Sequence, residues 1–259
     1  MNIGINIGAY PCSHEEQVAL MQTYGFSATF CSSLHPQLAE TVALCRRAGI
    51  TVESCHAPWN GINHIWRNCP EGEDMITRLL ASVDECAAHG IPVLVVHLSS
   101  GEHPPRVSDL GLSRFEQLMA QAKERGVTIA YENQRMLGNL SLAFEEFPDA
   151  AFCWDNGHEA CFTDGKRDYM ALFGDRLTAI HIHDNRATHD ADDHRIPGDG
   201  CIDFAPVIQK LAKANYQKAL MLELVAGHTP AYAEINADAF FARAAAAARR
   251  LADAVDAAR

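Results

Sequence analysis

The chain has 259 residues, of which 48% are hydrophobic and 21% charged, so it can bury a full core as one large α/β domain or two small ones. Its formal net charge of −12, with no Lys/Arg-rich block, argues against nucleic acid and anionic membranes as partners, because neutralising phosphates requires clustered basic residues. No secretory signal or run of ~20 apolar residues is present, and nine cysteines without a CxxC pair favour reduced thiols, so we expect a cytoplasmic protein.

Short apolar, β-branched runs recur along the chain and predict strands. The run Pro92–Val96 is apolar at every position, as expected for a strand that is covered on both faces. The predicted strands are Asn2–Ala9, Ser27–Cys31, Thr51–His56, Pro92–Leu98, Val127–Glu132, Ala150–Asp155, Leu177–Asp184 and Lys218–Leu224.

Helical patterns lie between these runs and after the last one. Gly25, Gly49, Gly90 and Gly126 follow four of them and are expected to end the helices as left-handed caps, and Asp203 is a predicted N-cap. The predicted helices are Ser13–Tyr24, Pro36–Ala48, Gly72–His89, Ser113–Arg125, Leu140–Phe147, Asp168–Phe173, Phe204–Asn215 and Ala237–Ala258.

This alternation amounts to eight strand–helix units in 259 residues, close to the ~250 residues typical of a (β/α)8 barrel. A doubly wound open sheet is the alternative, but no predicted strand is followed by the GxGxxG or P-loop pattern of a nucleotide site. The sequence has no internal linker and no shift in composition. We therefore predict a single (β/α)8 TIM barrel over residues 1–259.

Polar side chains follow six consecutive predicted strands at the point where each strand ends. Active sites of such barrels lie at this rim, so these side chains are expected to converge. They are His56, His97, Glu132, Asp155 with His158, His181 with His183, and Glu223; the loop after the seventh strand adds Asp192 and His194.

Two of the acidic residues, Glu132 and Glu223, are preceded by apolar residues that predict burial. An unpaired buried carboxylate costs several kcal/mol, so each needs a metal, a cation or a proton. A single histidine at a strand end is more often a hydrogen-bonded core or surface residue than a ligand. One divalent cation would compensate the buried carboxylates if it were bound jointly by two glutamates, an aspartate and a histidine from adjacent strands.

The order of these residues resembles that of the xylose-isomerase-like TIM barrels. The segment Asp192–Phe204, DDHRIPGDGCIDF, is similar to the D-x-H-x-x-P-G-x-G-x-I-D-W/F signature of the epimerase-like branch. The superfamily contains sugar isomerases and epimerases, inosose dehydratases and DNA-repair enzymes of the endonuclease IV type.

The resemblance implies a metal site at Glu132, Asp155, His181 and Glu223 that holds one divalent ion, Mn²⁺, Mg²⁺, Co²⁺ or Zn²⁺. The endonuclease branch binds further zinc ions at the positions that match His56, His97, His158, Asp192 and His194. Asp192 and His194 are therefore candidate additional ligands. The alternative for His56 and His97 is a hydrogen bond to substrate or support of the ligands.

The resemblance also implies a reaction, in which Glu132 and Glu223 remove and return a proton next to a carbonyl of a sugar or polyol. Inosose-type dehydration, or cleavage of a phosphodiester in the endonuclease manner, are alternatives on the same residues, as is a barrel that binds a sugar without turnover. The ketohexose 3-epimerases carry a substrate-binding arginine where this chain has Ala187, with Arg186 one position short. The predicted substrate-binding residues are His56, His97, His158, Trp59, His183, Arg186 and His194.

The segment Asn60–Pro70, after the third predicted strand, is longer than the usual 2–6 residues of such a loop. We expect Trp59, Trp66 and His64 to cover the sugar ring and exclude water. The alternative is a surface loop that packs on its own tryptophans or against a second subunit of a homo-oligomer.

Overall fold

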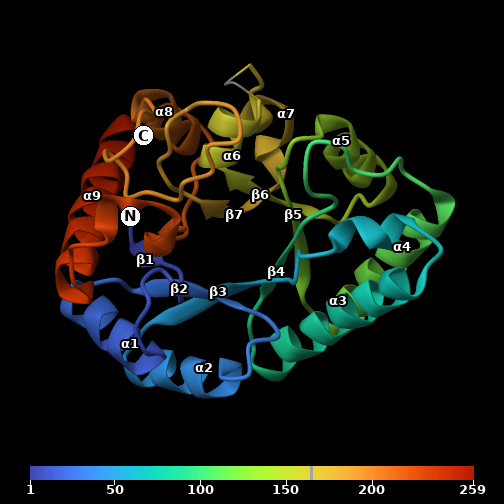
Figure 1. The fold of residues 1–259 in the computed structure, drawn as a ribbon, viewed down its shortest axis with the longest axis horizontal. Coiled ribbons are helices and arrows are strands. Elements are labelled where there is room, and N and C mark those ends of the chain that lie inside the picture. Colours follow the sequence, from blue (N-terminus) through green and yellow to red (C-terminus); the bar gives the residue numbers. More distant parts are fainter. Residues whose placement is uncertain (164–165) are drawn as a thin grey trace.

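Eight parallel strands lie side by side in the order β7-β6-β5-β4-β3-β2-β1-β8, and helices surround them (Figure 1). They were observed in a computed structural model that describes residues 1–163 and 166–259. The arrangement confirms the predicted (β/α)8 barrel. The strands are β1 (Ile3–Ile5), β2 (Ala28–Ser32), β3 (Thr51–His56), β4 (Val93–Val96), β5 (Thr128–Glu132), β6 (Ala151–Asp155), β7 (Leu177–His181) and β8 (Leu220–Leu222).

The barrel closes between β7 and β8 through the isolated bridge of Ile182 with Leu222. Ile182 N donates to Met221 O at 2.9 Å, and Glu223 N donates to Ile182 O at 3.1 Å. The prediction that strand seven continues to Asp184 is wrong, because Asp184 bridges Arg195 of the following loop instead. We call this join, formed by Ile182 with Met221–Glu223, the seam.

The helices alternate with the strands as predicted, with one addition. They are α1 (His14–Thr23), α2 (Leu38–Arg47), α3 (Pro70–Ala88), α4 (Asp109–Arg125), α5 (Leu137–Glu146), α6 (Asn156–Phe162), α7 (Tyr169–Phe173), α8 (Phe204–Lys213) and α9 (Ala237–Ala258). Single-turn 3-10 helices are η1 (Ile62–Trp66), η2 (Gly174–Arg176), η3 (Ala226–His228) and η4 (Pro230–Tyr232). The unpredicted α6 begins directly after β6, with Asp155 as its N-cap.

The predicted helix ends agree with the structure. Gly25, Gly49, Gly90 and Gly126 have φ between 65° and 72°, the left-handed region in which glycine carries no steric cost. The carboxylate of Asp203 accepts from Ala205 N at 3.0 Å and so caps α8. Among the described residues, no helix has both the length and the apolar character to cross a membrane.

Small side chains fill the inside of the barrel along β4 to β7. Val95, Ala130, Cys153 and Ala179 from β4 to β7 are buried together, apart from the larger core between strands and helices. Side chains two residues apart share a face of a strand. The next inward positions toward the carboxyl ends of these strands therefore form a layer above this core.

Candidate functional site

The layer above the small core is polar and is made by four predicted site residues. His97, Glu132, Asp155 and His181 each stand two residues beyond an inward-facing residue of the barrel interior. All four are buried, with exposed fractions of 8%, 2%, 0% and 1%. The strand register thus brings together residues that are up to 84 positions apart in the sequence.

Glu132 lies at the centre of this layer. Its Oε1 is 2.8 Å from Nδ1 of His181, and its Oε2 is 2.5 Å from Nε2 of His97 and 3.3 Å from Nε2 of His56. Burial raises the pKa of Glu132, but the imidazoles of His181 and His97 outweigh it and hold the pKa well below the usual range. Glu132 is therefore a buried carboxylate that stays ionised.

Asp155, His181 and Glu223 complete a four-residue group with Glu132, in which one candidate ligand atom from each lies within 4.8 Å of the others. His181 Nδ1 is 3.2 Å from Glu223 Oε2, so the imidazole contacts both glutamates. Within the described part of the chain, Asp155 Oδ2 and His181 Nε2 are buried without a hydrogen-bond partner. Three carboxylates, of which Asp155 has an unsatisfied oxygen, and the Nδ1 atom of one imidazole fit a divalent cation, which would compensate the charge.

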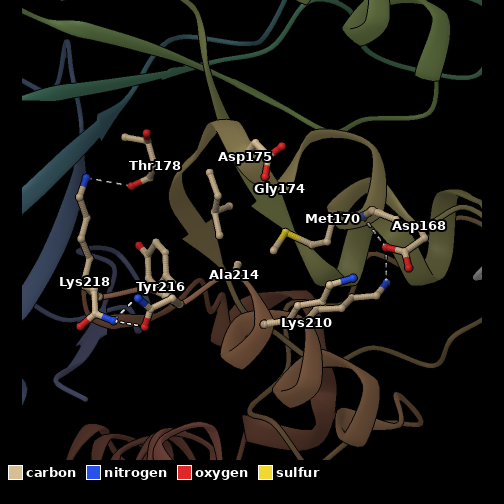
Figure 2. A pocket seen from close by; sticks show the side chains of 14 residues that line it. Asp168, Met170, Gly174, Asp175, Thr178, Lys210, Ala214, Tyr216 and Lys218 are labelled. Carbon is tan, nitrogen blue, oxygen red and sulfur yellow. Dashed lines mark hydrogen bonds and ion pairs between the residues drawn. The ribbon is translucent and has the colours of Figure 1, made fainter. Parts of the chain in front are cut away.

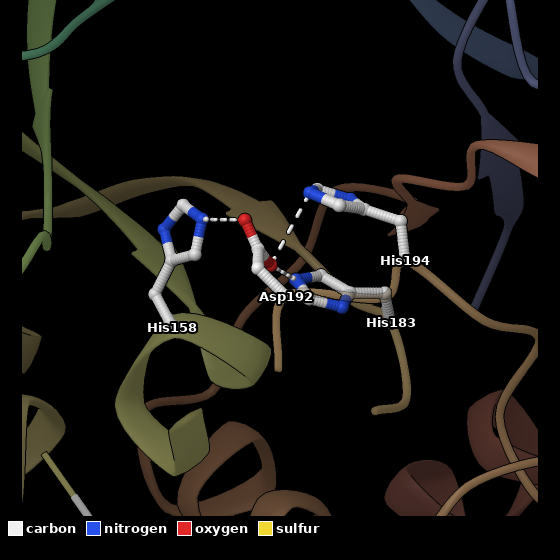
Figure 3. Close-up of side chains that lie close together, drawn as sticks. All are labelled: His158, His183, Asp192 and His194. Carbon is white, nitrogen blue, oxygen red and sulfur yellow. Dashed lines mark ion pairs between the residues drawn. The ribbon is translucent and has the colours of Figure 1, made fainter. Parts of the chain in front are cut away.

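A second group, drawn in Figure 3, lies beside the first and contains His158, His183, Asp192 and His194. Asp192 is in the middle: its Oδ2 is 3.4 Å from Nε2 of His158, and its Oδ1 is 3.3 Å from Nε2 of His194. The Nε2 atom of His183 is 3.6 Å from Asp192 Oδ1 and 3.2 Å from Asp155 Oδ1, so it joins the two groups. A third group, His56, His97 and Glu132, shares Glu132 with the first.

Three imidazoles have the same orientation. The Nδ1 atoms of His56, His158 and His194 lie 2.7, 3.1 and 3.1 Å from the main-chain oxygens of Ala57, Asn133 and Glu223, positions from which an N–H donates to the carbonyl. In this orientation the Nε2 atom of each ring faces an acidic residue. Metal-binding histidines are commonly oriented in this way.

The acidic residues also set the charge of these rings. Burial lowers the pKa of His194, but contact with Asp192 outweighs it and raises the pKa to about 9. Burial likewise lowers the pKa of His158, and Asp155 and Asp192 raise it well above the usual range. His97 differs, because burial dominates and lowers its pKa. The contacts with Asp155 and Asp192 therefore favour the protonated forms of His158 and His194.

The loop after β7 is organised by Asp184, which the sequence analysis placed at the end of strand seven without giving it a role. Its carboxylate accepts from the backbone N–H groups of Asn185, Gly198, Gly200 and Ile202 at 2.8 to 3.0 Å. A side chain on Gly200 would lie 2.4 Å from Asp184 Oδ1. The sequence motif after Asp192 is thus a set of backbone donors wrapped around one acid, and it positions Asp192 and His194.

Asn133 and Gln134 were also missed. The side chain of Asn133 exchanges two hydrogen bonds with the backbone of Asp155, both of 2.8 Å, and so fixes the end of β6. Nε2 of Gln134 is 3.2 Å from His97 Nε2 and 3.1 Å from His158 Nδ1. Both residues directly follow Glu132. An Asn–Gln pair immediately after an acidic residue at a strand end could have identified them as site residues from the sequence.

The two tryptophans of the loop after β3 have different roles. Trp59 is 54% exposed and its ring centroid is 6.1 Å from that of His97, at the rim. Trp66 is 5% exposed, donates from Nε1 to Leu98 O at 2.8 Å and packs on Phe115. The prediction that Trp66 covers the substrate is therefore wrong, since its ring is part of the core.

Arg186, predicted to bind substrate, forms a two-pronged ion pair with Asp193. Its Nε and Nη2 donate to Oδ2 and Oδ1 of Asp193 at 3.0 and 3.1 Å. The guanidinium is thus engaged in ordering the loop that carries Asp192 and His194. His64 lies with its Nδ1 3.8 Å from the sulfur of Cys69.

A cavity of about 470 Å³ opens beside the polar layer. Glu223, His56 and Trp59 line it, together with Phe30 and Ser32 of β2. A larger cavity of about 650 Å³ lies between α7 and α8 and is drawn in Figure 2. It is lined by the first residues of β7, Leu177 and Thr178, at the opposite end of the strand from His181, and by none of the predicted site residues.

Comparison with known proteins agrees with this fold. Residues 18–254 match the family model described as xylose isomerase-like TIM barrel. Protein y4fM of Sinorhizobium fredii, which is uncharacterized, is 29% identical over 213 residues, or 76% of this chain. This chain spans 65% of that relative's length.

Several solved structures share the fold at low sequence identity. D-psicose 3-epimerase from Clostridium cellulolyticum H10, solved with D-tagatose, has a TM-score of 0.78 at 12% identity, covering 98% of this chain and 99% of its own. The IolI protein with a bound zinc atom has a TM-score of 0.76 at 16% identity, covering 100% and 99%. The 3-keto-D-glucoside 4-epimerase YcjR of E. coli has a TM-score of 0.71 at 17% identity, covering 98% and 99%.

Proposed function

Because the chain belongs to the xylose isomerase-like TIM barrel family, we propose that it is a divalent metal-dependent isomerase or epimerase of a sugar or polyol. The observation that carries this proposal is the four-residue group of Glu132, Asp155, His181 and Glu223 beside an open cavity. The structural similarity to two sugar epimerases supports the same substrate class.

Glu132, Asp155, His181 and Glu223 would hold the cation. When bound, a divalent ion polarises a substrate carbonyl and lowers the pKa of the neighbouring C–H. Which of Mn²⁺, Mg²⁺, Co²⁺ and Zn²⁺ is used follows from affinity and supply rather than from ligand type alone.

Glu223 and Glu132 would move the proton. Glu223 lines the cavity and its side chain is 15% exposed, so it can reach a C–H of the substrate. The pKa of Glu223 is lowered, since His181 outweighs the effect of burial, and the residue is ionised and ready to accept a proton. Glu132 contacts the same Nδ1 atom of His181 and would return the proton.

The other residues would bind and shield the substrate. His56 lines the cavity and Trp59 covers its mouth, whereas His97 and His158 lie deeper and offer ring nitrogens to substrate oxygens. Returning the proton to the opposite face of the same carbon gives epimerisation, and returning it to the neighbouring carbon gives isomerisation. Loss of a β-hydroxyl from the same intermediate would be dehydration.

The test is a screen of keto-sugars, inososes and hydroxypyruvate for uptake of solvent deuterium at carbon in the presence of Mn²⁺. Glu132→Gln and Glu223→Gln should each abolish uptake, because each variant loses a ligand charge and a proton carrier. Glu124→Gln on the exposed face of α4 is the control and should retain activity. Near-normal rates in either site variant would exclude the two-glutamate mechanism.

The three neighbouring ligand groups favour a second candidate, a phosphodiesterase that uses several zinc ions. Glu132 would be shared by two ions, and Asp192 would serve a third with His158 and His194. About one ion per purified chain supports the isomerase, and about three ions with hydrolysis of a small phosphodiester support the phosphodiesterase. The net charge of −12 argues against a DNA substrate in either case.

A further inference from the structure

The cavity beside the site has one basic side chain on its outer wall. Arg78 lies on α3, outside the barrel, whereas Glu223 and His56 belong to the ends of strands. Arg78 is the only lysine or arginine among the described residues that line this cavity. A substrate anchored at Glu223 would therefore extend toward a guanidinium.

Packing fixes α3 next to the cavity. Ser82, one turn after Arg78, is buried, and its Oγ is 2.8 Å from Oγ of Ser33, which follows β2. Ser32, the last residue of β2, lines the cavity with Arg78. The helix face that carries Arg78 is thus held against the wall of the cavity.

The guanidinium of Arg78 has no ion-pair or hydrogen-bond partner in the described part of the chain, although a partner is available in sequence. Asp74 stands four residues earlier on the same helix, a spacing that favours an ion pair, and no such pair forms. By contrast, Arg114 pairs with Glu73 of that helix. In a chain with 33 acidic residues, a half-buried arginine without an acidic partner is available for a ligand.

The positive charge of Arg78 would also attract an anionic substrate. The net charge of −12 and the carboxylates of the site repel an anionic substrate. A planar guanidinium binds a carboxylate or a phosphate through two parallel hydrogen bonds, which gives both attraction and orientation. A neutral sugar would not require it.

We propose that Arg78 forms an anion-binding subsite, so that the sugar or polyol of this cavity carries a carboxylate or a phosphate ester at the end away from Glu223. The proposal rests on the proposed function for the placement of the reacting end. Ser32 and Asn60, which also line the cavity, offer polar groups for the hydroxyls between the two ends.

Binding of unreactive ligands tests the subsite. Glucitol, gluconate and glucitol 6-phosphate have no aldehyde or ketone group, and their dissociation constants are measured by calorimetry with metal-loaded protein. The variants are Arg78→Gln and Arg78→Lys, with Arg47→Gln from the exposed end of α2 as the charge-matched control. Melting curves check that each variant is folded.

We expect the wild type to bind at least one of the two anions tenfold or more tightly than glucitol. Arg78→Gln should remove this preference without changing the affinity for glucitol, Arg78→Lys should keep part of it, and Arg47→Gln should keep all of it. The anion that shows the preference identifies the charged group of the substrate.

Equal binding of all three ligands by the wild type, or an undiminished preference in Arg78→Gln, would overturn the proposal. Because these ligands cannot react, the result does not depend on turnover. An anion preference that requires Arg78, combined with no deuterium uptake by any keto-sugar, would reject the proposed reaction and leave the subsite standing.

Discussion

The ring of His183 packs directly against Gly157 at the rim of the barrel, since a β-carbon on Gly157 would lie 2.0 Å from Cε1 of His183. The backbone of Gly157 is held there, because its carbonyl accepts from Asn185 Nδ2 at 3.0 Å. His183 in turn stacks on His194 with ring centroids 4.1 Å apart. The second ligand group thus depends on the absence of a side chain at position 157.

Gly157→Ala is therefore expected to displace His183 and to destabilise the protein by about 1–3 kcal/mol, the usual cost of overpacking a core. Urea unfolding measures the change. Gly138→Ala is the matched control, since Gly138 is an exposed helical glycine with no atom within 4 Å of the added carbon. It should stabilise α5 by up to ~1 kcal/mol. Equal effects of both substitutions would contradict the steric argument.

Removal of the cation should lower the melting temperature. Glu132, Asp155 and Glu223 place three carboxylates within one group, and without a cation their repulsion is opposed by imidazoles and by the backbone N–H of His158 on Asp155. Differential scanning calorimetry with and without a chelator measures the effect, and re-addition of Mn²⁺ or Zn²⁺ should restore the melting temperature. A melting curve indifferent to the chelator would show that these residues hold no metal in the purified protein.

The metal-free protein should lose stability between pH 6.5 and about pH 9. The pKa of His194 rises from 6.5 to about 9 on folding because contact with Asp192 outweighs burial. A group whose folded pKa is raised stabilises the protein fully below its unfolded pKa, and this contribution is lost as pH rises through the folded value. The shifts of His158 and His181 have the same direction.

Melting curves of the chelated protein across this pH range measure the loss, and His194→Gln should reduce it. Because a cation needs neutral imidazole, metal affinity should rise over the same interval. Flat stability from pH 6.5 to 9 would mean that His194 is already neutral in the folded protein.

Trp59→Ala and Trp66→Ala should separate substrate binding from stability. Trp59 is exposed at the mouth of the cavity, so its loss should raise the Michaelis constant about tenfold and leave the melting temperature unchanged. Trp66 is buried, and its truncation should cost about 3–5 kcal/mol. The Michaelis constant is measured with the substrate that the deuterium screen identifies. A normal constant in Trp59→Ala would mean that Trp59 does not contact the substrate.

Much of the site could be predicted because it follows strand periodicity. Glu132, Asp155 and His181 stand at the ends of apolar runs, and the inward face of each strand is set by alternation. Predicting where each strand ends was enough to predict that these residues meet at one rim, without knowing which strands are neighbours.

The remainder depends on tertiary contacts that have no local signal. The burial of Trp66 requires Gly111 on α4, where a side chain would lie 2.1 Å from the indole. Helix α6 was missed because it starts directly after the last residue of β6, with no linker to mark it. The role of Asp184 depends on a loop that returns to it 14 to 18 residues later.

Two of the proposed metal ligands lie at the seam between β7 and β8. Ile182 makes the closing bridge with Leu222, and His181 and Glu223 are the immediate neighbours of these two residues. A cation bound by both side chains would link the ends of β7 and β8 across the seam. Separation of these two strands would then require release of the ion, and the lifetime of the bound ion would measure how often the barrel opens at the seam.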